Sequence, residues 1–372
     1  MDPAALAGMD LNKVPALPLP NPPPAHYAGL GTGPQLHTTT VVMFAILAPI
    51  AILAVALRFH WSLKNPGGKV SAADWCGLGA LMLTLTQESI ILTMGDYQRH
   101  QWDVSLATMM KPVFFKKTYV QYVIAWPAIS LAKLSILLLY LQLFRVNTGL
   151  RWAVWSGIVL TCIAYLPNIG VSSYYCAAHP GEAWDYKIGI RCGNKDVLKW
   201  LIASAALSLT LDLYIMFLPI PQIMSLNLSL RRRLGLCLIF LAAAFACICA
   251  LLTLIYRVHL ANAADPMWPG AQLWVTNLTE NFVAIIVGSV PGMNSWYKKI
   301  FKTSSVYSKF TSSFSSMSRS TVTKSQGTTS TKYESNDKRD IYPMTGYSEF
   351  DHESQRSLAG SHVEVTESGH WL

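Results

Sequence analysis

The chain has 372 residues, of which 52% are hydrophobic and only 13% are charged. This charged fraction is about half of that in ordinary soluble domains and is too small to cover a soluble globule of this size. The sequence also lacks a nucleophile motif, a phosphate-binding loop and a nucleic-acid-binding pattern. We therefore do not expect the chemistry of a known soluble enzyme, and we predict no nucleic-acid partner.

The segment 1–37 is rich in proline and has no basic region followed by an apolar core. We therefore predict an exposed, disordered tail that is prone to the polyproline II conformation. A cleavable signal peptide is not expected, so the first membrane helix would act as the uncleaved insertion signal.

Seven apolar runs follow, each long enough to cross a bilayer core of about 30 Å at about 1.5 Å per residue. In chain order they cover residues 39–57, 75–94, 120–144, 153–174, 201–223, 234–256 and 272–290. We therefore predict an all-α fold, a seven-helix transmembrane bundle over residues 38–297 in contact with the lipid bilayer, with disordered tails at both ends.

After the last run the chain becomes basic and then rich in serine and threonine. Residues 298–372 are predicted to be a disordered cytosolic tail because they cannot form a core of their own. The lysines from Lys298 to Lys309 are expected to lie against anionic lipid. A kinase acting on the nearby serines, beginning with Ser312, would weaken that attachment. A solvated tail without regulation is the alternative.

Two independent features predict the orientation in the membrane. The shortest connections, 145–151 and 224–233, are basic without an acid, which places them in the cytosol, and Arg58 is counted in the first cytosolic connection. Cys176 and Cys192 flank the connection between the fourth and fifth spans, where a disulfide needs an oxidising compartment. We therefore predict an extracytosolic N-terminus and a cytosolic C-terminus, in the plasma membrane or an endomembrane.

Motifs in a fixed order along residues 38–300 resemble one known family. They are Ala73-Asp74-Trp75, Gly95 followed by His100, Trp102 and Asp103, the run from Lys133 to Arg145, the set Cys176, Pro180, Trp184 and Cys192, Asp212 with Leu218-Pro219-Ile220-Pro221, and finally Trp274, Glu280 and Pro291. In this order they resemble the fungal rhodopsin-like domain proteins, seven-helix membrane proteins of filamentous fungi. The sequence departs from the family pattern at Ala73, Gln142 and Ser208.

The resemblance implies a function, because genes of this family recur in secondary-metabolite clusters. It implies an accessory or tailoring component of such a pathway, which handles or modifies an apolar small-molecule intermediate; whether it is an enzyme stays open. A receptor for an extracellular small molecule is the alternative, since it fits seven helices, a disulfide in an outer loop and a phosphorylatable tail. The coupling motifs of many animal receptors are absent. A transporter is the third hypothesis, but the expected internal repeat is not visible.

The family name suggests retinal, and a retinal protein needs a buried lysine in its last helix. The seventh predicted span has no lysine before Lys298. We therefore predict that no retinal or other cofactor is bound.

Ionisable residues inside the predicted spans are candidates for an intramembrane polar pocket. Near the bilayer centre such a group costs roughly 2.5 to 3.5 kcal/mol, so it normally faces the bundle interior and has a partner. Lys133 and Asp212 both fall roughly 20 Å below the outer surface, and we predict that they pair. Glu88 and Glu280 fall roughly 10 to 12 Å deep, within reach of Arg257, and these three are expected to line a cavity open to the outside.

Several roles stay open for these residues. The pair of Lys133 and Asp212 is either a structural ion pair that fixes helix register or part of a ligand or proton-transfer site. Glu280 either acts as a general acid or stays neutral and hydrogen-bonded to a neighbouring helix. The outer connections add candidate ligand contacts at His100, Trp102, Asp103 and Trp184. The histidines lack metal-ligand spacing, so no metal site is predicted.

Overall fold

The computed structural model describes residues 10–18, 29–64, 70–143, 148–221 and 230–303. For residues 143, 230–239, 242 and 291–303 the backbone alone is described. The side chains of the C-terminal tail, with its predicted lipid-binding lysines and kinase sites, therefore lie outside the described residues.

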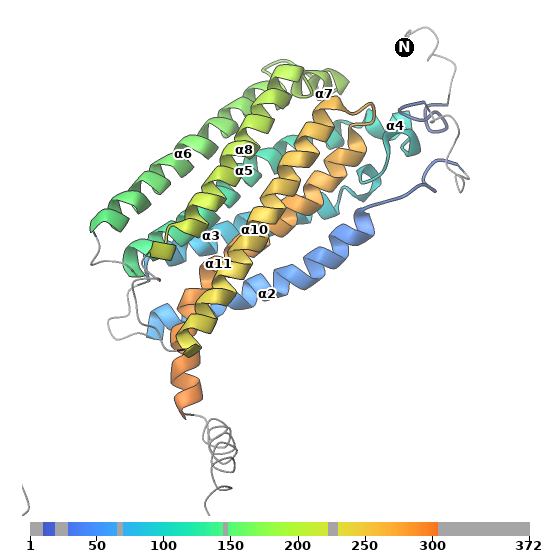
Figure 1. Cartoon of the computed structure of the whole chain (residues 1–372). Coiled ribbons are helices and arrows are strands. Elements are labelled where there is room, and N and C mark those ends of the chain that lie inside the picture. Colours follow the sequence, from blue (N-terminus) through green and yellow to red (C-terminus); the bar gives the residue numbers. More distant parts are fainter. Residues whose placement is uncertain (1–9, 19–28, 65–69, 144–147, 222–229, 304–372) are drawn as a thin grey trace, which may run out of the picture. The chain divides into compact units, whose positions relative to one another are not determined.

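Seven helices are long and apolar enough to cross a membrane, which confirms the predicted all-α, seven-helix fold (Figure 1). They are α2 (His37–Lys64), α3 (Ala72–Leu92), α5 (Pro112–Leu143), α6 (Thr148–Cys176), α8 (Lys195–Phe217), α10 (Leu230–Asn262) and α11 (Met267–Thr303). The connections carry the short elements η1 (Gly95–Tyr97), η2 (Gln101–Asp103), α4 (Leu106–Met109) and α7 (Tyr186–Cys192). In the described ranges β pairing is confined to two isolated bridges.

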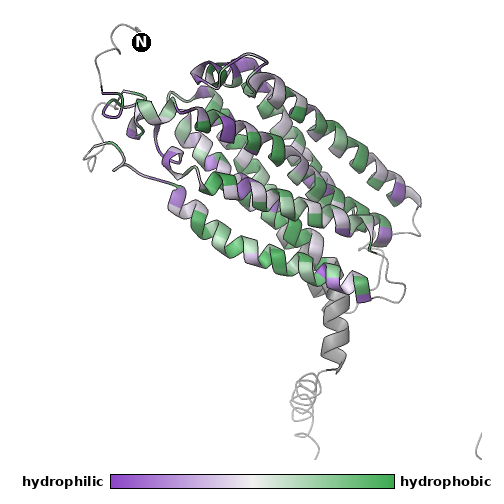
Figure 2. Ribbon diagram, turned by 180° about the vertical axis from the view of Figure 1, so that it is seen from behind, coloured by the Kyte–Doolittle hydropathy of each residue, from purple (hydrophilic) through white to green (hydrophobic). Residues whose placement is uncertain are grey.

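The outer surface of these helices is apolar. Large hydrophobic side chains such as Leu53, Ile163 and Leu241 are 59%, 61% and 64% exposed. Figure 2 shows hydrophobic residues along the helices and more hydrophilic ones at their ends and in the connections. An apolar surface of this kind suits lipid, so the chain is a multi-pass membrane protein.

Helix α5 packs against α3, α6 and α11, and α11 also packs against α2 and α10. Helix α8 lies between α6 and α10. Where α2, α3, α5 and α11 meet, the core contains small residues, including Ala51, Ala80 and Ala132, around Leu278 and Phe282. Small side chains allow helices to approach closely, which is the usual basis of packing in a bilayer.

One end of the bundle carries α7 and the disulfide between Cys176 and Cys192, and we call it the disulfide end. The predicted disulfide is therefore confirmed. It ties the last residue of α6 to the last residue of α7. Asp185 caps α7 by accepting a hydrogen bond from the Lys187 N–H, and the side chain of Asn194 caps the start of α8.

The described parts of the N-terminal segment lie against the connection between α3 and α5. The backbone of Ala16 and Leu36 donates hydrogen bonds to the carbonyls of Val104 and Gln98 at 2.8 and 2.9 Å. These residues therefore cover part of the disulfide end before α2 begins at His37.

The placement of Arg58 in a cytosolic connection is wrong. Helix α2 continues to Lys64, and Arg58 lies inside it with only 4% of its surface exposed. The Nε of Arg58 forms an ion pair with Asp74 of α3 at 2.7 Å, and this partner allows the charged arginine to be buried inside the helix. The apolar run alone ends before Arg58 and gives no sign of the ion pair.

Candidate functional site

The predicted pair of Lys133 and Asp212 is present in the middle of the bundle. Lys133 is 1% exposed, and its Nζ lies 2.7 Å from Asp212 Oδ1. The same ammonium donates to the carbonyl oxygen and the hydroxyl of Ser208 at 3.1 and 3.0 Å. Tyr165 of α6 places its ring 5.6 Å from Nζ and its hydroxyl 2.7 Å from Ser208 Oγ. These contacts join α5, α6 and α8 and use all three N–H donors of the lysine.

Glu280 lies in the interior between α11 and α10. Thr253 Oγ1 donates to Glu280 Oε2 at 3.2 Å, which is a hydrogen bond to a neighbouring helix as in one of the two alternatives for Glu280. Its other oxygen, Oε1, is buried without a partner in the described part of the chain. The charge of Glu280 acts on Lys133, Asp212 and Arg257, which makes these four residues one electrostatic cluster.

Glu88 stands apart from this cluster. It is fully buried on α3, and both of its carboxylate oxygens lack a hydrogen-bond partner among the described residues. Gln87, the residue before it, Thr84, one turn earlier on α3, and Asn281 of α11 also have buried oxygens without partners in the described part of the chain. A buried carboxylate without a hydrogen-bond partner is costly when ionised.

A cavity of about 720 Å³ lies at the disulfide end. Its walls come from η1, η2, α4, α5, α7, α8, α10, α11 and the end of α6, and both disulfide cysteines line it. The aromatic side chains of its wall are Tyr97, Phe114, Phe115, Tyr119, Tyr122, Tyr186 and Trp274. Of the five predicted pocket residues, Arg257 lines this cavity, whereas Glu88, Lys133, Asp212 and Glu280 are not among its lining residues.

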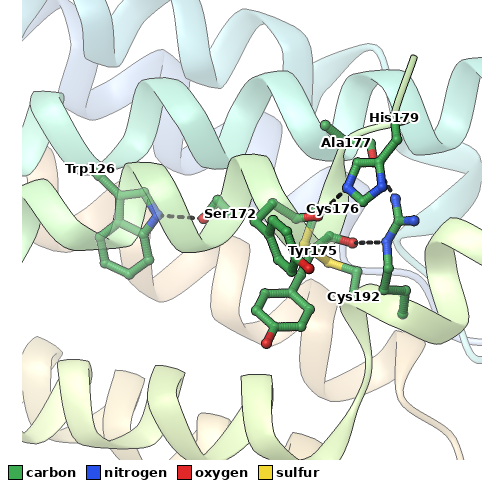
Figure 3. Close-up of a disulfide and its surroundings, with 9 residues drawn as sticks. Trp126, Ser172, Tyr175, Cys176, Ala177, His179 and Cys192 are labelled. Atoms are coloured by element: carbon green, nitrogen blue, oxygen red, sulfur yellow. Dashed lines mark hydrogen bonds between the residues drawn. A yellow bond between two sulfur atoms is a disulfide. The ribbon is translucent and has the colours of Figure 1, made fainter.

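The disulfide and its neighbours hold one wall of the cavity in place. Figure 3 shows Cys176 bonded to Cys192, with Trp126 of α5 donating from Nε1 to Ser172 Oγ at 3.1 Å. Arg191, next to the second cysteine, donates to the carbonyls of Tyr175 and Ala177 at the end of α6. The connection between α6 and α8 is thus fixed covalently and by hydrogen bonds.

Glu182 and Arg191 form a half-buried ion pair in this connection, with Nη1 3.0 Å from Oε2. The backbone N–H of His179 also donates to the Glu182 carboxylate at 2.9 Å. The His179 hydrogen bond and then the Arg191 side chain hold the pKa of Glu182 below its ordinary value.

Among the predicted outer candidates, His100 has the most specific surroundings. Its ring stacks on Trp102 at 4.9 Å and on Trp268 at 4.1 Å between ring centroids. Its Nδ1 lies 2.7 Å from the carboxylate of Asp265, just before α11. His100 therefore links the connection between α3 and α5 to the residues at the start of α11.

Asp103 is 2% exposed and binds the N-terminal segment. Its carboxylate accepts hydrogen bonds from the N–H groups of Gly31 and Gly33 at 2.8 and 3.1 Å and forms an ion pair with Arg99 at 3.1 Å. A Cβ on Gly33 would come within 2.9 Å of Asp103, so glycine permits this close approach. Trp184, the last outer candidate, packs its ring 5.8 Å from that of Tyr119 at the cavity wall.

Sequence reasoning missed the network around Arg58 at the opposite end of the bundle. Besides its ion pair with Asp74, Arg58 donates from Nη1 to Ser135 Oγ at 3.0 Å and to the Gly288 carbonyl at 2.8 Å. Ser135 in turn donates to the Ala73 carbonyl at 2.8 Å. The network joins α2, α3, α5 and α11. The signal in the sequence was an arginine directly after the first apolar run, paired with the acid of the Ala73-Asp74-Trp75 motif.

Comparison with known proteins gives two similarities. The sequence pattern of the fungal rhodopsin domain matches residues 57–299, well over half of the chain. A SAT4 family membrane protein from Emericella nidulans is 24% identical over 181 residues, which are 47% of this chain and 44% of that protein. The chain therefore aligns with less than half the length of this relative.

Proposed function

We propose that this chain, which belongs to the fungal rhodopsin domain family, binds an apolar small molecule in the cavity at the disulfide end. The observation that carries the proposal is the cavity itself. Its volume of about 720 Å³ falls within the range of ordinary ligand sites, and its wall combines aromatic and aliphatic side chains with a few polar groups. The surrounding disulfide and hydrogen bonds support a preformed site.

The cavity lies at the end of the bundle that carries the disulfide, which supports an extracytosolic position for this end. With the N-terminus on the same side as the disulfide, the C-terminal tail would reach the cytosol. We propose this orientation for the protein. We also propose that all seven helices contact the lipid bilayer.

The pathway hypothesis follows from the resemblance to fungal rhodopsin-like proteins. The bound molecule would be an apolar intermediate of secondary metabolism, and the protein an accessory or tailoring component of that pathway. The second candidate is a receptor for an extracellular small molecule, and the position of the cavity at the disulfide end favours it.

Residues of this structure do not fit retinal, which must form a covalent bond with a buried lysine. The described part of the last span, residues 267–290, has no lysine. Lys133 is buried, but its three donors are used by Asp212 and Ser208, and it does not line the cavity. We expect the purified protein, incubated with all-trans retinal, to develop no shifted absorption band; a visible band lost on Lys133→Met would contradict this.

The binding proposal can be tested with the neutral fluorophore N-phenyl-1-naphthylamine and purified protein in lipid nanodiscs. Energy transfer from tryptophan reports binding, since Trp274 lines the cavity. Gly270 also lines the cavity, and a Cβ built on it meets nothing within 4 Å, so Gly270→Phe should fill the site. Gly170 of α6 has equally open surroundings but does not line the cavity, which makes Gly170→Phe the matched control.

The wild type and Gly170→Phe should give saturable transfer above that of empty nanodiscs, and Gly270→Phe should lose it. Equal signals from all three proteins would show that the fluorophore binds lipid and would refute the site. To separate the two candidate roles, metabolites and transcripts of a deletion strain are compared with the parent. Accumulation of one intermediate with steady transcripts supports the pathway component, whereas metabolite changes with broad transcriptional shifts support the receptor.

A further inference from the structure

We propose that the ligand of the cavity is an apolar acid, with a hydrocarbon or aromatic body and one anionic group that binds Arg257. This inference rests on the proposed function and names the chemical class of the molecule. It is carried by the charges of the cavity wall and by the unused hydrogen-bonding groups of Arg257.

The charged side chains that line the cavity are both cationic. Lys195, at the start of α8, is exposed at the disulfide end, and Arg257, near the end of α10, lies deeper. The lining residues include no aspartate or glutamate. A wall with two cations and no acid attracts an anion and disfavours a cationic ligand.

Arg257 has no hydrogen bond or ion pair within the described residues. Its Nε is buried without a partner, and its guanidinium lies 5.6 Å from the centroid of the Trp126 ring. A guanidinium has five N–H donors and favours bidentate binding of a carboxylate or similar oxyanion. Arg257 as a whole is half-buried at the cavity wall, and a cation held there without such a partner is costly. An anion that enters the cavity would supply the missing hydrogen bonds and charge.

Glu280 does not take this role. It acts on Arg257 only at a distance, since the two side chains form no ion pair within 4 Å, and one of its oxygens accepts from Thr253. Glu280 is also not a lining residue. A ligand anion in the cavity therefore reaches Arg257 without displacing a protein carboxylate.

Two further polar groups of the wall are available to the ligand. Thr118 Oγ1 and Gln101 Oε1 are buried, line the cavity and have no hydrogen-bond partner among the described residues. The remaining wall is mainly aromatic and aliphatic. This combination fits a molecule with one charged end and a large apolar body, and it does not fit a sugar or a polyanion.

The test compares two probes with the same ring systems and different charge. 1-Anilinonaphthalene-8-sulfonate carries one sulfonate, and N-phenyl-1-naphthylamine is neutral. Arg257→Gln should weaken binding of the sulfonate at least about tenfold, as expected for the loss of a hydrogen-bonded charge pair, and change binding of the neutral probe less than about twofold. Arg257→Lys should retain most of the sulfonate affinity. Arg151→Gln, an exposed arginine of α6 that does not line the cavity, is the matched control.

A second measurement needs no variant of Arg257. On the wild type, 1-naphthaleneacetic acid should displace the neutral probe at a concentration at least about tenfold lower than its methyl ester. Equal displacement by acid and ester, or unchanged sulfonate affinity in Arg257→Gln, would overturn the anionic class while the cavity site stands. If neither probe binds the wild type above empty nanodiscs, the proposed function itself fails.

Discussion

Replacing Lys133 by Met removes the cation of the buried pair that joins α5 to α8. With Nζ and Oδ1 2.7 Å apart, the gross attraction is about 6 kcal/mol at an effective dielectric constant of about 20. Desolvation offsets part of this, so we expect Lys133→Met to lower the free energy of unfolding by about 3–5 kcal/mol, because Asp212, whose side chain is 13% exposed, then stays in the bundle interior without its counter-charge. Asp212→Asn should cost a similar amount, since Lys133 then has only neutral acceptors and no counter-charge.

The double variant, Lys133→Met with Asp212→Asn, decides between an ion pair and a simple polar contact. Removing both charges should cost about 2–4 kcal/mol less than the sum of the single changes. Hydrogen-bonded side chains in membrane proteins typically couple by only about 0.6 kcal/mol. Unfolding is measured by circular dichroism in mixed micelles with increasing dodecyl sulfate. A coupling energy below about 1 kcal/mol would refute the assignment of the pair as ionic.

Three further outcomes are expected. Arg58→Met should lower the free energy of unfolding by about 3–5 kcal/mol in the same assay, because the buried Asp74 loses its counter-charge and keeps only the hydrogen bonds from Ser62 and Ser71, whereas Lys64→Met at the exposed end of the same helix should have little effect. Cys176→Ser opens a disulfide across a sequence separation of 16 residues and should cost about 3 kcal/mol; reductant should have the same effect on the wild type and none on the variant. Because the folded pKa of Glu182 is below its ordinary value of 4.5, its stabilisation is present above that pH and is lost as pH falls through the folded pKa, so the loss of stability on acidification should be smaller in Glu182→Gln than in the wild type.

The sequence allowed the spans to be predicted because the thickness of the bilayer sets the length of each apolar run. The pairing of Lys133 with Asp212 could also be predicted from the sequence. The residue count along each helix gives the depth of a side chain in the membrane, and a charge near the bilayer centre needs a partner. The disulfide followed from two cysteines at the two ends of one connection.

The position of the cavity could not be predicted in the same way. Glu88 and Glu280 were expected at similar depths, but Glu280 meets Thr253 of α10 and Glu88 has no partner in the described part of the chain. Which neighbour a helix face meets depends on the order of the helices in the bundle, and that order is not readable from hydropathy. Arg58 was misplaced for a related reason, because its partner Asp74 belongs to the next helix.

The way in which α10 is attached to its neighbours has a mechanical consequence. Arg58 joins α2, α3, α5 and α11, and Lys133 joins α5, α6 and α8. Helix α10 packs against α8 and α11, and its described side chains make polar contacts to other helices through the Thr253 hydroxyl and through Arg257, which lies over an aromatic ring. Arg257 is also the group that would grip a ligand. A ligand bound there contacts a helix of 33 residues, about 50 Å long, so a shift of α10 at the disulfide end would be carried to its opposite end.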